Sequence, residues 1–225
     1  MMRTDNDNDD VVAPVEDGVP PLIVSDEHVV YRDCFAADYT VFECQATVRD
    51  TGKTFRMHTT QVNDGRTGAV CIARLESADT DEHTEARYLI ARHWRISTHA
   101  WGWEFPRGMG EEHESAEETA RRELKEETGI DAPLECVDVI QHIHADTGVL
   151  RDSIAIAEIT VTDADIDAAR PVKSRTGDTD WELRNAHWVD ANTLRAMIAD
   201  GEITDGITLA SWAIHECREG AAQRK

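Results

Sequence analysis

The chain has 225 residues, 40% of them hydrophobic and 30% charged, a balance typical of a globular protein with a substantial core. Its formal net charge of −22 excludes a broad basic surface of the kind that binds nucleic acid backbones or anionic membranes. We therefore expect neither nucleic acid nor a membrane as a partner.

Cysteine usage and the start of the chain both indicate a cytoplasmic protein. The five cysteines are scattered and form no CxxC pair, which is typical of reduced thiols and not of a zinc site. The first residues lack the basic and apolar regions of a signal peptide, and no apolar run has transmembrane length. We expect a cytoplasmic location.

The amino-terminal part divides into a tail and a β-rich segment. Residues 1–21 are rich in Asp and Pro, which predicts a disordered acidic tail. Residues 22–62 contain alternating apolar runs at 40–48 and 53–62 on either side of an Asp-Thr-Gly turn. This pattern is typical of an antiparallel hairpin, and we expect two or three strands forming a separate β subdomain.

The main domain is predicted to extend over residues 63–217, with a tail at 218–225. Apolar runs predict strands and capping residues predict helices. In chain order we expect strands at 68–76, 88–94 and 100–108, the last ended by Pro106, a helix at 116–128, strands at 134–144, 150–161 and 181–189, and helices at 190–199 and 205–217. The stretch 162–180 is expected to be mostly loop, with a short helix at its start. This order predicts an α+β fold of the α/β/α sandwich type.

The central helix has clear signals at both ends. Ser115 followed by Glu118 forms a capping box at its start, and Gly129 suits the left-handed residue that ends a helix. Ala120 and Leu124 lie on the side that would pack on a core. The caps therefore fix which residues face outward.

Three carboxylates share one face of this helix. Glu123, Glu126 and Glu127 stand at positions i, i+3 and i+4, where like charges repel unless a cation lies among them. Mg²⁺ prefers carboxylate oxygens and leaves coordination sites open for substrate phosphate. The sequence therefore predicts a divalent metal site.

The spacing of residues across the segment Gly108–Ile130 resembles the Nudix box. It runs Gly108, five residues, Glu114, seven residues, Arg122-Glu123-Leu124, one residue, Glu126-Glu127, one residue, Gly129-Ile130. A solvated, charge-rich surface helix is the ordinary alternative, but such a helix needs no Gly and Glu at fixed distances before it. The resemblance extends over roughly residues 66–215. It implies the Nudix fold with a mixed central sheet, and the added amino-terminal hairpin is similar to the dimerising subdomain of the ADP-ribose pyrophosphatase branch, which implies a homodimer.

The resemblance implies a role for each residue of the box. Glu123 and Glu127 would bind Mg²⁺, or Mn²⁺, directly, with Glu126 as a further ligand or acid. The main-chain carbonyl of Arg107 or Gly108 would complete the metal shell, Arg122 would orient the glutamates, and Glu114 would tie the loop to the helix. A general base outside the box would come from the later loop at 177–184, where Asp178, Asp180 and Glu182 are candidates.

The resemblance gives candidate substrate contacts before the box. The segment from residue 92 to Gly108 resembles the part of ADP-ribose and nucleoside-diphosphate-sugar hydrolases where an arginine meets phosphate and an aromatic ring stacks on the base. Arg95, Trp101 and Trp103 are the candidates, although the alternating tryptophans suit core packing equally well. Arg107 stands where this branch commonly has a small residue, and its extra charge would suit a substrate with more phosphate.

The implied activity is hydrolysis of the diphosphate bond of ADP-ribose or a related nucleoside diphosphate sugar. The products would be a nucleoside monophosphate and a sugar phosphate. Two alternatives remain at this stage. One is hydrolysis of a nucleoside triphosphate or a dinucleoside polyphosphate, and the other is a nucleotide-sensing module without catalysis.

Overall fold

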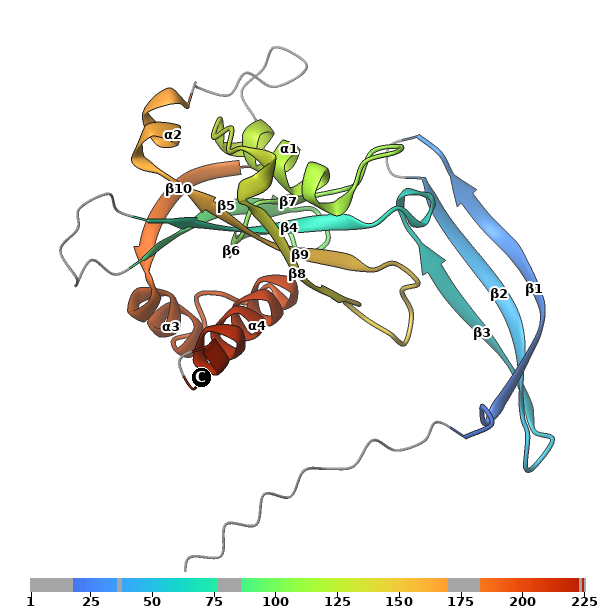
Figure 1. Ribbon diagram of the computed structural model, residues 1–225. Coiled ribbons are helices and arrows are strands. Elements are labelled where there is room, and N and C mark those ends of the chain that lie inside the picture. Colours follow the sequence, from blue (N-terminus) through green and yellow to red (C-terminus); the bar gives the residue numbers. More distant parts are fainter. Residues whose placement is uncertain (1–17, 36–37, 77–85, 170–182, 223, 225) are drawn as a thin grey trace, which may run out of the picture.

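A computed structural model describes residues 18–35, 38–76, 86–169, 183–222 and residue 224 (Figure 1). An antiparallel sheet of three strands stands at the amino-terminal end. It is followed by a larger mixed sheet with helices on both faces. The predicted α+β architecture with an added amino-terminal sheet is confirmed.

The amino-terminal sheet has the strand order β1-β2-β3. Its strands are β1 (Leu22–Asp33), β2 (Tyr39–Val48) and β3 (Thr54–Gln61). The turn between β2 and β3 uses Gly52 at a φ of 67°, a conformation that glycine adopts without a steric cost. A short 3₁₀ turn, η1 (Asn63–Gly65), then leads into the main domain.

The central sheet has the order β10-β5-β4-β9-β8, with β6 paired to β5 and β7 paired to β4. The β4–β9 pair is parallel, and the other pairs of this sheet are antiparallel. The strands are β4 (Gly68–Leu75), β5 (Arg87–Arg95), β6 (Ala100–Glu104), β7 (Arg107–Gly108), β8 (Val137–Ile143), β9 (Ile154–Val161) and β10 (Leu183–Asp190).

Helices cover the two faces of this sheet, and alternation along β4 provides a core for each face. Figure 1 shows α1 on one face and α3 and α4 on the other. Ala69, Cys71 and Ala73 pack toward α1, whereas Val70 and Ile72 pack toward α3 and α4. The helical elements are α1 (Ala116–Thr128), η2 (Leu134–Cys136), α2 (Asp163–Ala168), α3 (Ala191–Ala199) and α4 (Gly206–Ala222). β4 is therefore buried on both faces and contributes side chains to both cores.

Several predicted boundaries differ from the structure. The predicted strand 100–108 divides at Phe105-Pro106 into β6 and β7, which pair with different partners. Strand β9 starts only at Ile154, because the main chain just before it bonds elsewhere: Arg151 N–H donates to Thr60 O at 2.9 Å. Strand β8 starts at Val137, after the η2 turn. The last helix continues to Ala222, through most of the predicted tail.

The amino-terminal sheet is joined to the main domain through the loop before β9. Thr60 N–H donates to Val149 O at 2.8 Å, and Val62 N–H donates to the Asp152 carboxylate at 2.8 Å. The Arg151 guanidinium lies 4.0 Å from the centre of the Phe42 ring and bonds to Glu27. Strands β1 to β3 thus contact a loop that also reaches the candidate site described below.

Among the residues that the structure describes, no helix combines the length and apolar character needed to cross a membrane.

Candidate active site

The predicted caps hold α1 in place. Glu118 N–H donates to Ser115 Oγ at 3.2 Å, and Ser115 N–H donates to the Glu118 carboxylate at 2.8 Å. At the other end, Gly129 has a φ of 81° and its N–H donates to Lys125 O at 2.9 Å. Ala120 and Leu124 are fully buried. The register of the helix is therefore fixed, which determines where the acidic side chains lie.

Arg122 is the hub of the acidic segment. Its Nε and Nη2 donate to Glu114 at 2.8 and 3.0 Å, and Nη1 donates to Glu123 at 2.6 Å and to Glu126 at 3.2 Å. Nη2 also donates to Met109 O at 2.8 Å. The guanidinium therefore holds two of the candidate metal ligands side by side.

Glu114 connects the glycine loop to α1. Besides Arg122, it accepts a hydrogen bond from Glu111 N–H at 2.9 Å and one from Thr119 Oγ1 at 3.0 Å. The Arg122 hydrogen bonds and these further donors lower the pKa of Glu114 to about 2 against the opposing effect of burial. The carboxylate stays ionised at neutral pH and ties the loop to the helix.

Glu123 lies against the main chain of Gly108, where no side chain intervenes. Strand β7 pairs with β4, which brings Gly108 opposite Ala69 and beneath α1. A Cβ built on Gly108 would overlap the Glu123 carboxylate, so this position excludes every other residue unless Glu123 moves. Burial raises the pKa of Glu123, and the nearby charges of Glu126 and Glu114 add to the effect of burial while Arg122 opposes it. A cation beside Glu123 would relieve this electrostatic cost.

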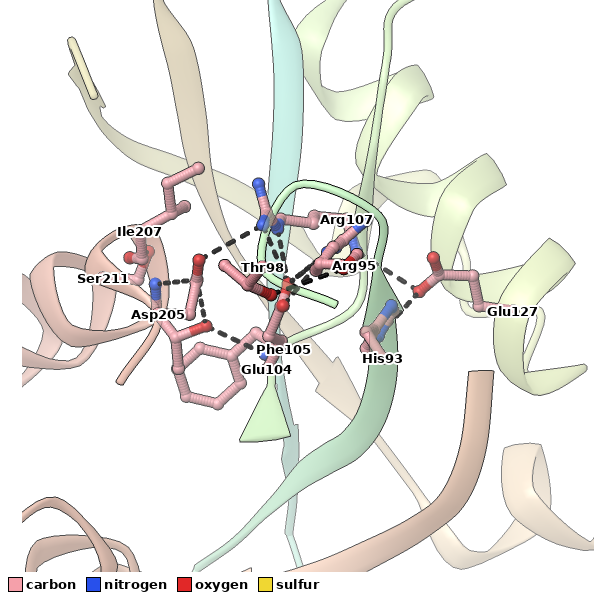
Figure 2. A network of polar contacts seen from close by, with 11 residues as sticks. His93, Arg95, Thr98, Glu104, Phe105, Arg107, Glu127, Asp205, Ile207 and Ser211 are labelled. Carbon is pink, nitrogen blue, oxygen red and sulfur yellow. Dashed lines mark hydrogen bonds and ion pairs between the residues drawn. The ribbon is translucent and has the colours of Figure 1, made fainter. Parts of the chain in front are cut away.

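Glu127 faces strands β5 and β7. Its carboxylate accepts a hydrogen bond from Arg107 N–H at 3.3 Å and lies 4.0 Å from His93 Nε2 (Figure 2). His93 is 2% exposed on β5. The three box glutamates therefore come from one helix but have different neighbours: Gly108 for Glu123, Arg122 for Glu126 and the Arg107 N–H for Glu127.

These groups line a cleft of about 960 Å³. Its wall includes Arg107, Gly108 and the three glutamates Glu123, Glu126 and Glu127, together with Arg95 and Arg122. Residues 150 and 152–154 form another part of the wall, as does Ile207 at the start of α4. The structure thus brings the predicted metal ligands and two predicted substrate contacts into one cleft.

The two tryptophans lie beside β5, and neither is among the described residues that line this cleft. Trp101 packs near Trp94, with ring centres 5.8 Å apart, and Arg184 lies 4.8 Å from its ring centre. Trp103 is half-buried against the core, with Arg92 5.2 Å from its ring centre. Their stacking on a base stays a prediction.

Asp178, Asp180 and Glu182, the candidates for the general base, lie outside the described residues. Their role also stays a prediction.

Two acids of the site were missed by the sequence analysis. Glu104 ends β6 and is 2% exposed, yet it bonds to both Arg95 and Arg107. Asp205 reaches Arg107 from the turn before α4 at 3.2 Å. An acid inside the apolar run WGWEFP was the available signal for Glu104, since a buried carboxylate needs a cationic partner. No local pattern pointed to Asp205.

Two cleft residues come from the η1 connection and were also missed. Asn63 is buried, donates from Nδ2 to Gly110 O at 2.7 Å and accepts from Arg66 Nη2 at 2.7 Å. Both side chains line the cleft. They extend the contact between the amino-terminal sheet and the glycine loop.

The donor set fits a hard divalent cation. Within the described ranges, no three acidic, His or Cys side chains are gathered as a formed metal centre. The carboxylate oxygens of Glu123, Glu126 and Glu127, however, all belong to side chains that line one cleft, and Glu123 lies against the main chain of Gly108. Such oxygens are the ligands that Mg²⁺ and Mn²⁺ prefer. Nudix enzymes generally use divalent cations.

Comparisons with known proteins identify the family and the fold. The family model for the NUDIX domain matches residues 66–209. No curated protein matches the sequence. A solved structure described as an ADP compounds hydrolase has a TM-score of 0.67 and 14% sequence identity, and the match covers 92% of this chain and 99% of that chain. At this identity the likeness concerns the fold. Because the family model covers more than half of the sequence, the chain belongs to the Nudix hydrolase superfamily.

Proposed function

We propose that this Nudix hydrolase cleaves the diphosphate bond of ADP-ribose or a related nucleoside diphosphate sugar, with Mg²⁺ as its cofactor and Mn²⁺ as a substitute. The products would be a nucleoside monophosphate and a sugar phosphate. The observation that carries the proposal is the complete acidic face of α1 on the wall of a cleft that also contains Arg95. The fold shared with an ADP compounds hydrolase supports the substrate class.

The chain's own residues would mainly position groups and neutralise charge. Glu123, Glu126 and Glu127, with the carbonyl of Arg107 or Gly108, would hold the cation. When bound, the cation would activate water and neutralise charge on the diphosphate oxygens. Arg122 keeps Glu123 and Glu126 in place through its two Nη1 hydrogen bonds. Arg95, on the cleft wall, would contact a phosphate oxygen of the substrate.

The water molecule that attacks phosphorus needs a proton acceptor. We propose Glu182 or Asp180 for this role, from the residues that precede β10 in the sequence. A glutamate or aspartate in that place would accept the proton as the phosphorus–oxygen bond forms.

A substrate panel tests the activity. With Mg²⁺, ADP-ribose should yield AMP and ribose 5-phosphate, measured by chromatography, and nucleoside triphosphates and dinucleoside polyphosphates should react more slowly. Turnover only of triphosphates or polyphosphates would contradict the proposal. Nucleotide binding without metal and without any turnover would favour a sensing module.

A Glu127→Gln variant tests the metal site within the same assay. Loss of one ligand charge should lower kcat by about 10²-fold or more and weaken Mg²⁺ activation, because the carboxylate acts only when ionised. Glu135→Gln, which changes an exposed glutamate outside the box, is the matched control and should retain activity. Equal activity of both variants would remove Glu127 from the metal site.

We also propose that two copies form a homodimer through the amino-terminal sheet. Strand β1 exposes an unusual number of apolar side chains for a soluble surface, namely Ile23, Val24, Val29, Val30 and Tyr31. Sedimentation should give twice the 25.2 kDa chain mass, and a Val24→Lys/Val29→Lys variant should sediment as a monomer. A monomeric wild type would contradict this arrangement.

A cytoplasmic location completes the proposal. All five cysteines are free thiols, and two of them, Cys44 and Cys71, are buried. Thiols persist in a reducing compartment, which supports this location.

A further inference from the structure

The side chain of Arg107 lies between two carboxylates (Figure 2). Its Nε and Nη2 donate to Glu104 Oε2 at 3.0 and 2.8 Å, and Nη2 also donates to Asp205 Oδ1 at 3.2 Å. Glu104 is 2% exposed, so this contact is shielded from water. The guanidinium therefore has two anionic partners from its own chain.

Arg107 and its neighbour Arg95 differ in the carboxylates that they contact. Arg95 donates to the same Glu104 carboxylate, from Nε at 3.0 and 3.2 Å and from Nη2 at 2.6 Å. The two guanidiniums and the two carboxylates of Glu104 and Asp205 together have no net charge. Arg107 contacts both carboxylates, whereas Arg95 shares only Glu104. The guanidinium of Arg107 thus joins β6 to the start of α4, and its ion pairs act as an attachment between these two elements.

Asp205 connects this cluster to the first turn of α4. Its Oδ2 accepts hydrogen bonds from Thr208 N–H and from Thr208 Oγ1, both at 2.8 Å. Thr208 Oγ1 in turn accepts from Phe105 N–H at 3.3 Å. The two residues on either side of Pro106 are therefore both attached to the start of α4.

The main chain of Arg107 faces the opposite way, toward α1. Its N–H donates to the Glu127 carboxylate at 3.3 Å, and the next residue, Gly108, lies under Glu123. A shift of the Arg107 backbone would therefore move the N–H group that donates to Glu127. It would also move Gly108, against which Glu123 lies.

We propose that Arg107 is a positioning residue, which attaches the short strand β7 to the start of α4 and thereby holds the main chain that supports Glu127 and Glu123. Its guanidinium does not serve as a phosphate ligand. The positive charge of Arg107 therefore gives the enzyme no preference for substrates with an additional phosphate, in contrast to the expectation from the sequence. The statement about substrate preference rests on the proposed function. The statement that Arg107 attaches β7 to α4 does not.

A double-variant cycle tests the attachment without any activity measurement. Arg107→Ala and Asp205→Asn should each lower Tm by about 3–8 °C, and the double variant should be little worse than either single variant. The control pair is Arg218→Ala and Asp138→Asn, an exposed ion pair that also joins α4 to the sheet, at 3.1 Å, and it should show almost no coupling. Additive effects of Arg107→Ala and Asp205→Asn would overturn the proposal.

Metal binding tests the link to the glutamates. Titration of Mn²⁺ into the full-length protein without substrate should show affinity reduced about 10-fold in Arg107→Ala and in Asp205→Asn, because groups that support metal ligands have effects of this size. Arg107→Lys keeps the charge but loses the fork geometry, and it should resemble Arg107→Ala. Unchanged Mn²⁺ affinity in Asp205→Asn would overturn the link. If Arg107→Ala does not fold, Asp205→Asn and Arg107→Lys provide the test.

Substrate preference then separates the two roles of Arg107. The ratio of kcat/KM for ADP-ribose to that for ATP should change less than about 3-fold in Arg107→Ala. A loss of 10-fold or more for ATP alone, with no effect of Asp205→Asn, would identify Arg107 as a phosphate ligand. If wild type hydrolyses neither compound, the proposed function fails, while the Tm cycle and the Mn²⁺ titration still decide the structural part.

Discussion

A single arginine organises the acidic side chains around α1. Arg122 bonds to Glu114, Glu123 and Glu126 and to one main-chain carbonyl. Without its charge, carboxylates at i, i+3 and i+4 spacing would repel and spread apart. Arg122 therefore holds Glu123 and Glu126 at a spacing that like charges alone would not keep.

The low pKa of Glu114 predicts a defined pH dependence of stability. Its folded pKa is about 2, below the ordinary value of 4.5, so the ionised form stabilises the fold. This contribution is complete above about pH 4.5 and is lost as the pH falls toward 2. Glu114→Gln should lower the free energy of unfolding at pH 7 by about 1–3 kcal/mol. Urea denaturation measured between pH 7 and 3 should show a smaller loss for the variant than for wild type.

The exposed Glu135→Gln variant is the control for this measurement, and its pH profile should match that of wild type. Parallel profiles of Glu114→Gln and wild type would contradict the assignment.

The contact between Gly108 and Glu123 predicts a local effect on activity. Gly108→Ala should displace the Glu123 carboxylate and lower metal-dependent turnover by about 10-fold or more, since small displacements of catalytic groups have large effects. Circular dichroism should show an intact fold. Gly206→Ala is the matched control, because a Cβ there meets no atom within 4 Å, and it should retain activity. Full activity of Gly108→Ala would exclude the contact as a constraint.

Local spacing predicted the box residues, but it could not predict their long-range partners. Arg122 and Glu126 stand at i and i+4, so their contact follows from the period of the helix, and Glu114 lies just before the helix begins. The Arg107–Asp205 contact joins residues 98 positions apart and depends on how α4 docks. The expected substrate role of Arg107 rested on its place before the box and on its charge, and neither of these indicates a contact with Asp205.

At the level of elements, α1 is held both by its ends and by its packing. The capping box satisfies main-chain donors that would otherwise lack partners, and Ala120 and Leu124 are buried in the core. The correct prediction of the helix at 116–128 followed from these caps. Strand limits were harder, because β8 and β9 begin where tertiary hydrogen bonds allow and not where the apolar pattern begins.

Removal of the amino-terminal cap should therefore weaken the helix measurably. Ser115→Ala should lower the free energy of unfolding by about 1 kcal/mol, which corresponds to a Tm decrease of about 2–4 °C in a chain of this size. Differential scanning calorimetry gives this value directly. Ser97→Ala, in an exposed turn, is the control and should stay within about 0.5 kcal/mol of wild type. A Ser115→Ala variant as stable as the control would show that the cap does not contribute.

At the level of the whole molecule, the net charge of −22 opposes compactness. Salt shortens the range of this repulsion from about 30 Å at 0.01 M to about 3 Å at 1 M. Tm should therefore rise by a few degrees between 0.01 and 0.5 M NaCl, and KCl should act equally, because the effect is screening and not specific binding. A falling Tm would mean that attractive ion pairs such as Arg122–Glu114 outweigh the overall repulsion.

The parallel pair β4–β9 also determines when the site can form during synthesis. It joins Gly68 to Ile154 and Leu75 to Val161, so the centre of the sheet closes only after about two thirds of the chain has been made. Contacts between residues so distant in sequence form slowly, because loop closure must precede them. On the ribosome, α1 would therefore have its caps long before β9 emerges to complete the sheet beneath it. Until then the sheet beneath the acidic side chains of α1 would be incomplete, so the cleft that they line would form in one late step.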